Sequence, residues 1–179
     1  MIVPVWAASW ELSCCQPEAE VGTRWVVPIS FNPKTDPWWV SDHGASATVA
    51  QRDYGVADLM IRRDREAPRL LSAGELRFYG PSDLAEGRHQ GRFFVDAHSD
   101  DHESIPGGGA VSAVDLVPIR FRLSDGAAGR QMYVPSEQLD PVRVSSTVER
   151  SQLDEWVGEQ ETRVICELLV WIEIGDSDA

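Results

Sequence analysis

The 179-residue chain carries 29 Asp and Glu against 16 Lys and Arg, giving a formal net charge of −13, and 42% of its residues are hydrophobic, with seven Trp among its aromatics. This apolar content can build a core, which argues against global disorder and favours a single domain. With only one lysine, Lys34, the chain lacks the clustered cations that bind nucleic acid or an anionic membrane surface, so we expect neither as a partner.

The three cysteines, Cys14, Cys15 and Cys166, are too few and odd in number for a disulfide framework, which favours a reducing compartment. The apolar residues 1–10 are preceded by no Lys or Arg, and no apolar run of about 18 residues occurs. We therefore expect no signal peptide and no transmembrane helix, and a cytoplasmic location.

The hydrophobic pattern predicts mostly strands. Alternation is clearest at residues 117–123, where Val117, Ile119 and Phe121 share one face. Further strands are predicted over residues 2–12, 24–31, 75–79, 92–97, 131–134, 142–144 and 162–174. Residues 45–63 fit either a helix or a strand, and the glycine-rich residues 99–109 predict a loop.

One short helix is predicted over residues 151–160. Ser151 and Asp154 fit a capping box, and Leu153, Trp156 and Val157 recur at helical spacing. The fold class that we expect is mostly β: an antiparallel small barrel or curled sheet with one short C-terminal helix. Residues 1–175 are expected to form one β-rich domain, with any lobe boundary within residues 82–91, and residues 176–179 a frayed tail.

The N-terminal stretch resembles a family of uncharacterised small proteins from high-GC bacteria, a domain of unknown function, whose hairpin reads W-x-x-x-C-C-G-x-P…V-G-x-x-V-x-W. Trp10, Cys14, Cys15, Val21, Gly22 and Trp25 match in order. Gln16 stands where the family has Gly, and Ala19 where it has Phe. The resemblance implies membership of a group without an assigned activity.

Residues 96–103 hold the densest set of potential metal ligands. His98, Asp100 and His102 would suit a divalent ion such as zinc. The competing interpretation is a solvated acidic loop that holds no cofactor. Glu103 follows His102 as in H-E-x-x-H, but position 106 is a proline, so the zinc-protease motif is absent.

A second set of candidates suits contact with a partner. Adjacent strand residues face opposite ways, so we expect one of Trp38 and Trp39 to be exposed and available to a partner, and His43 follows them in a loop. Cys14 and Cys15 are explained by buried packing, by a metal or by thiol chemistry.

Motifs of common enzymes are missing. The sequence has neither the phosphate-cradling G-x-x-x-x-G-K-[ST] nor G-x-S-x-G nor G-x-G-x-x-G, so we expect no catalytic residues and no cofactor. The function predicted first is an acidic protein-interaction module with a protein partner. The alternatives are a metal-binding protein or metal-dependent hydrolase that uses the His98 and His102 loop, and an immunity or antitoxin-like protein.

Overall fold

The computed structural model describes residues 1–8, 18–33, 55–96, 107–125, 131–144, 148, 154–155 and 162–175. These residues form twelve strands in one continuous sheet and no helix. The strands are β1 (Ile2–Ala7), β2 (Arg24–Val27), β3 (Ile29–Asn32), β4 (Ala57–Arg63), β5 (Leu70–Ala73), β6 (Leu76–Tyr79), β7 (Gly87–Val95), β8 (Gly107–Asp125), β9 (Gln131–Gln138), β10 (Val142–Val144), β11 (Asp154–Glu155) and β12 (Thr162–Glu173).

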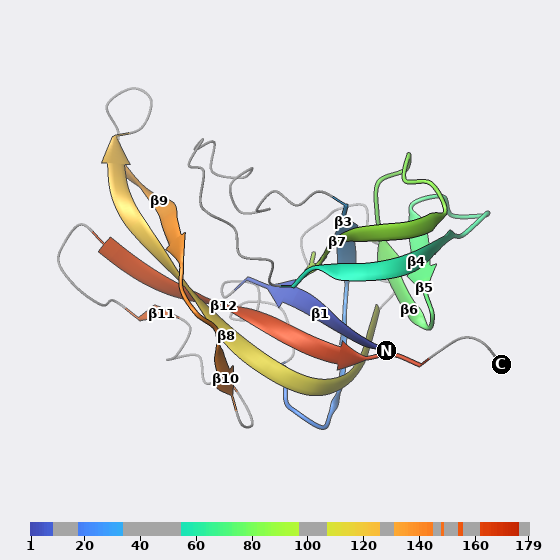
Figure 1. Ribbon diagram of the computed structural model, residues 1–179, viewed down its shortest axis with the longest axis horizontal. Helices are drawn as coiled ribbons and strands as arrows, with labels where there is room; N and C mark the ends of the chain where they lie inside the picture. The colour runs from blue at the N-terminus through green and yellow to red at the C-terminus, as the bar shows by residue number, and fades with distance from the viewer. Residues whose placement is uncertain are drawn as a thin grey trace.

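Five of these strands close into a small barrel. The pairings run β3–β6–β5–β4–β7 and return to β3, so the ring is complete. Phe31, Phe78 and Phe93 fill its interior, with ring centroids 5.7 Å, 5.0 Å and 4.8 Å apart. Such tilted and edge-to-face contacts add to the hydrophobic gain from burying each ring. The barrel forms the right-hand side of the molecule in Figure 1.

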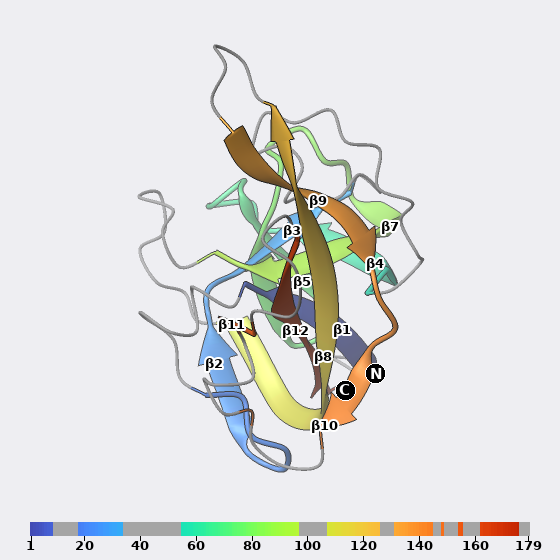
Figure 2. The ribbon, with the colours of Figure 1, turned by 90° about the vertical axis from the view of Figure 1, so that its left-hand side faces the viewer.

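The remaining strands form an open sheet that starts from the barrel strand β7. β1 pairs in parallel with β7 at Val5 and Trp6, and its other edge pairs antiparallel with β12. β12 in turn pairs with β8 along twelve residues. The outer edge of the 19-residue β8 is then covered by three short strands in succession, β2, β10 and β9. Figure 2 shows β8 curving along its length. β2 pairs with its start, β10 with its middle and β9 with its second half.

A triple glycine allows three strands to meet at the start of β8. A Cβ at Gly107, Gly108 or Gly109 would lie only 2.3, 2.0 or 2.3 Å from a backbone oxygen of a neighbouring segment. Glycine is thus required by close backbone approach, as well as by the φ of +146° at Gly108. The loop predicted through residue 109 is wrong at these three positions, because the glycines open a strand.

The mostly β prediction is confirmed, including the small barrel, although the β3–β6 and β1–β7 pairs are parallel. Within residues 45–63, residues 55–63 are described, and 57–63 of them form the strand β4. Of the predicted helix at 151–160, only Asp154 and Glu155 are described, and they form β11 by pairing with Ile165 and Val164. The helix prediction is wrong at these two residues, since they extend the edge of β12. The rest of the predicted helix lies outside the described residues.

Candidate functional site

A single row of residues crosses six strands on one face of the sheet. Successive register pairs join Ser30 to Phe94, Phe94 to Trp6, Trp6 to Leu169, Leu169 to Asp115, and Asp115 to Arg143. Because strand side chains alternate between faces, the row one residue further along points the other way. That second row consists of Phe31, Phe93, Val5, Val170, Val114 and Val144, and faces the main hydrophobic core.

The buried polar side chains of the described residues all lie on the first of these faces, which we call the polar face. They are Ser30, Arg92, Asp115, Gln138 and Glu167. Register places Ser30 and Asp115 in the first row, Arg92 and Glu167 two residues from it, and Gln138 opposite Ile119, four residues from Asp115 on the same face. Burial of polar groups is unfavourable unless they are paired, so their restriction to one face distinguishes that face from the apolar core.

The middle of the polar face is a small second core. Trp6, Val117 and Leu169 are at most 2% exposed, and Phe94 and Trp171 pack against them. Gly55, with a φ of +69°, covers the indole: a Cβ at this position would lie 2.2 Å from Trp6 Nε1. This apolar centre separates the two polar ends of the face.

At one end, three residues from three strands form what we call the Asp115 patch: Asp115 on β8, Arg143 on β10 and Trp171 on β12. Arg143 Nε lies 2.5 Å from Asp115 Oδ1, and Nη2 donates to Oδ2 at 3.2 Å. The indole Nε1 of Trp171 donates to Oδ2 at 2.6 Å. The Asp115 side chain is only 8% exposed, whereas that of Arg143 is 60% exposed.

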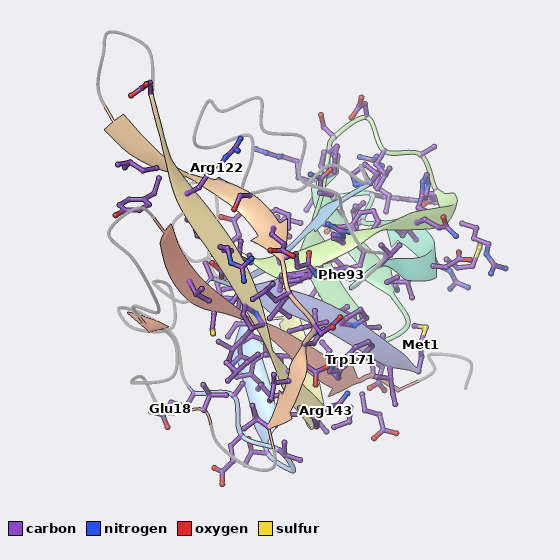
Figure 3. The ribbon with its side chains drawn as sticks, turned by 60° about the vertical axis from the view of Figure 1, so that its left-hand side comes forward. Met1, Glu18, Phe93, Arg122, Arg143 and Trp171 are labelled. Carbon is purple, nitrogen blue, oxygen red and sulfur yellow. The ribbon has the colours of Figure 1, made fainter. Side chains whose placement is uncertain are left out.

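The patch therefore presents a fixed cation and a half-buried indole to solvent, both held by one buried carboxylate. Figure 3 shows Arg143 and Trp171 near each other on the sheet. A guanidinium that donates to two carboxylate oxygens and an indole fixed through its N–H lose little side-chain entropy when a partner binds. Arg and Trp are also among the residue types that contribute most to protein–protein affinity. The arrangement suits recognition of another molecule.

The residues that the sequence singled out are not among those that the structure describes. Cys14, Cys15, Trp38, Trp39, His43, His98, Asp100 and His102 are all outside the described residues, so their predicted roles stay predictions. Among the described residues, the Cys166 side chain is buried, and no three His, Cys, Asp or Glu side chains are grouped to hold a metal ion. No helix of the described part is long and apolar enough to span a membrane.

The fold and the patch together define a small all-β protein in which a closed barrel continues into an open sheet with one polar face. The chain belongs to a family of unknown function, DUF6578, whose family model matches residues 1–174. This confirms the expected membership of a family without assigned function. No curated protein and no solved structure matches the chain.

Proposed function

We propose that the protein is a protein-interaction module that docks its partner on the polar face at the Asp115 patch. The observation that carries the proposal is the contrast in exposure within one ion pair: the carboxylate of Asp115 is buried, and the guanidinium that it fixes is open to solvent. A buried anion thus orients an accessible cation beside an indole.

Stability alone does not account for this arrangement. A buried ion pair usually stabilises a fold no better than well-packed apolar residues of similar volume, because desolvation offsets much of the Coulomb attraction. The opposite face of the same strands shows the apolar solution, with Val114 and Val170 fully buried in line with Phe93. The polar residues on the patch side are therefore better explained by binding than by packing.

Two expectations from composition complete the proposal. The low cysteine content supports a cytoplasmic location. The use of fifteen arginines beside one lysine supports an origin in a high-GC genome.

Site-directed photo-cross-linking of the full chain in native lysate tests the docking surface. A photoreactive residue is placed at Glu173, which is exposed and two residues from Trp171 on the same face, or at Met60, which is 62% exposed on the barrel. We expect a specific protein adduct from position 173 and not from position 60. The same adducts from both positions, or none from position 173, would contradict the proposed surface.

Variants of the same tagged protein then test the role of the patch. Arg143→Ala and Asp115→Asn should both abolish the adduct. Arg143→Ala removes the exposed cation, and Asp115→Asn weakens the ion pair that holds this cation in place. Arg62→Ala, an exposed arginine on β4, is the matched control and should leave the adduct unchanged. Circular dichroism confirms that each variant is folded. An adduct that still forms with folded Arg143→Ala protein would contradict the proposal.

A further inference from the structure

The outermost strand of the open sheet, β10, has one edge without a neighbouring strand. Among the described residues, β10 pairs with β8 alone, and it lies beside β8 at the margin of the sheet (Figure 2). In a pair of strands, the N–H and C=O groups of every second residue point away from the partner strand. The outer edge of β10 therefore offers main-chain donors and acceptors to a further strand.

The usual protection of a sheet edge is weak at β10. Natural edges are blocked by charged side chains, by proline or by a covering segment. The three residues of β10, Val142–Val144, include no proline, and their single charge, on Arg143, already pairs with Asp115 of β8. Val142 is apolar and yet 57% exposed. These features fit an edge that receives a strand better than one that repels it.

Arg143 determines which side chain an added strand should carry on the polar face. Register aligns Arg143 with Asp115, so the residue opposite Arg143 in an added strand would continue the same row. A guanidinium has five N–H donors, and Asp115 engages only those of Nε and one of Nη2. The protons of Nη1 and the second proton of Nη2 have no partner among the described residues. This outer side of the guanidinium suits a second carboxylate.

Val142 and Val144 determine the residues on either side of that carboxylate. They lie on the face opposite to Arg143, in line with the core residues Leu116 and Val114. Val144 already packs partly against this core, whereas Val142 stays exposed. Cross-strand neighbours on one face pack against each other, so apolar residues opposite the two valines would extend the core outward. The complementary segment thus reads apolar, acidic, apolar.

A second copy of the chain does not provide this segment through its own β10. Antiparallel pairing of β10 with itself, centred on its middle residue, would place Arg143 directly opposite Arg143. Like charges in directly opposite positions destabilise a pair of strands. The formal net charge of −13 on each chain also opposes self-association, and it favours a partner segment with one acidic residue over a polyacidic one. The segment therefore belongs to a different protein.

We propose that the partner adds an extended segment to the outer edge of β10, with one Asp or Glu opposite Arg143 and apolar residues opposite Val142 and Val144. Addition of a strand to a sheet edge is a recurring mode of peptide recognition, in which main-chain hydrogen bonds supply affinity and side chains supply specificity. The inference rests on the proposed function, because it identifies the part of the partner that meets the Asp115 patch.

NMR titration of the isotope-labelled full chain with capped peptides tests the acidic residue. The probes are Thr-Thr-Val-Glu-Val-Thr-Thr and the same peptide with Gln in place of Glu, both acetylated and amidated so that Glu carries the only charge. The Glu peptide should shift the amide signals of Val142–Val144. The Gln peptide should bind about tenfold more weakly, the change expected from one lost charge-assisted hydrogen bond. No binding of the Glu peptide at about 5 mM, or equal affinity of the two peptides, overturns the proposal.

N-methylated peptides test whether the segment binds as a strand. Neighbouring residues of an added strand direct their N–H groups to opposite sides, so only one of two successive N–H groups meets β10. N-methylation of the Glu and N-methylation of the Val that follows it should therefore differ, because one removes a hydrogen bond to β10 and the other does not. One of these peptides should lose binding and the other should retain it. Equal effects would contradict strand addition.

Variants of the full chain locate the contact. Arg143→Gln should remove the preference for the Glu peptide over the Gln peptide, whereas Arg62→Gln on β4 should retain it. A preference that persists in folded Arg143→Gln protein overturns the proposal. If the Glu peptide does not bind while the cross-linked adduct from position 173 still forms, strand addition is wrong and the interaction surface stands. The reverse result rejects that surface and leaves the peptide site at β10.

Discussion

Arg143 and Asp115 are direct register partners on β10 and β8, yet one side chain is 60% exposed and the other 8%. The pair therefore spans the boundary between solvent and interior. Because the two ends of the interaction are solvated so differently, removing one partner should not have the same effect as removing the other.

The first prediction is an asymmetric double-mutant cycle at this pair. Arg143→Ala leaves a buried carboxylate without its cation and should lower the free energy of unfolding by about 2 kcal/mol, less than the 3–5 kcal/mol of fully buried pairs because water reaches this site. Asp115→Leu leaves an arginine that water can solvate, together with the Trp171 N–H, and should lower it by about 1 kcal/mol.

The double variant Arg143→Ala, Asp115→Leu should come within about 1 kcal/mol of wild type, because an apolar side chain replaces the buried charge. Urea unfolding of all variants gives these values. Strictly additive effects of the single substitutions would show that the two residues do not interact.

The second prediction separates backbone strain from steric conflict at two glycines. Gly87 and Gly108 have similar φ values, +136° and +146°, but a Cβ at Gly87 meets nothing within 4 Å, whereas at Gly108 it lies 2.0 Å from the Trp25 carbonyl oxygen. Gly108→Ala should therefore destabilise the fold by about 2 kcal/mol more than Gly87→Ala. Chemical denaturation measures both, and equal losses would mean that β2 adjusts to the added methyl group.

The sequence predicted those parts of the fold in which apolar and polar residues alternate along a strand. The alternation of Val117, Ile119 and Phe121 identified the second half of β8. The first half of β8 was not predicted, because the glycines at its start are also typical of a loop. Only the three-dimensional contacts show that Gly108 faces the Trp25 carbonyl oxygen.

The candidate sites were harder to predict for a different reason. Asp115 lies between Val114 and Leu116, and a charged residue inside an apolar run is a signal that could have been noticed. Its partners Arg143 and Trp171 are 28 and 56 residues away. Such pairs follow from strand register, which is set by the whole sheet and not by local spacing.

The third prediction concerns Arg63, whose guanidinium joins two loops at one end of the barrel. It donates to the carbonyl oxygens of Pro68, Ser82 and Leu84, the second at 2.7 Å. Arg63→Ala should lower the free energy of unfolding by about 1–2 kcal/mol, since the bonds are partly exposed. Arg63→Lys should recover little, because a single ammonium lacks the planar fork that reaches all three oxygens.

Urea unfolding measures both Arg63 variants, with Arg62→Ala as the neighbouring exposed control. Hydrogen exchange should show faster opening of residues 80–86 in both. Full recovery by lysine would show that charge alone is needed at this position.

The fourth prediction is a pH dependence at the pair formed by Asp58 and Arg88. Arg88 Nε and Nη2 each donate to one oxygen of Asp58 at 2.7 Å, and these hydrogen bonds lower the pKa of Asp58. A lowered folded-state pKa stabilises the fold above the unfolded value of about 3.9, and this contribution disappears as the pH falls through the folded-state pKa. The difference in Tm between wild type and Asp58→Asn should therefore be constant from about pH 7 to about pH 5 and shrink below about pH 4.

Both side chains of the Asp58 and Arg88 pair are exposed, so added salt should reduce the difference in Tm at neutral pH. A difference in Tm that grows on acidification would contradict this assignment.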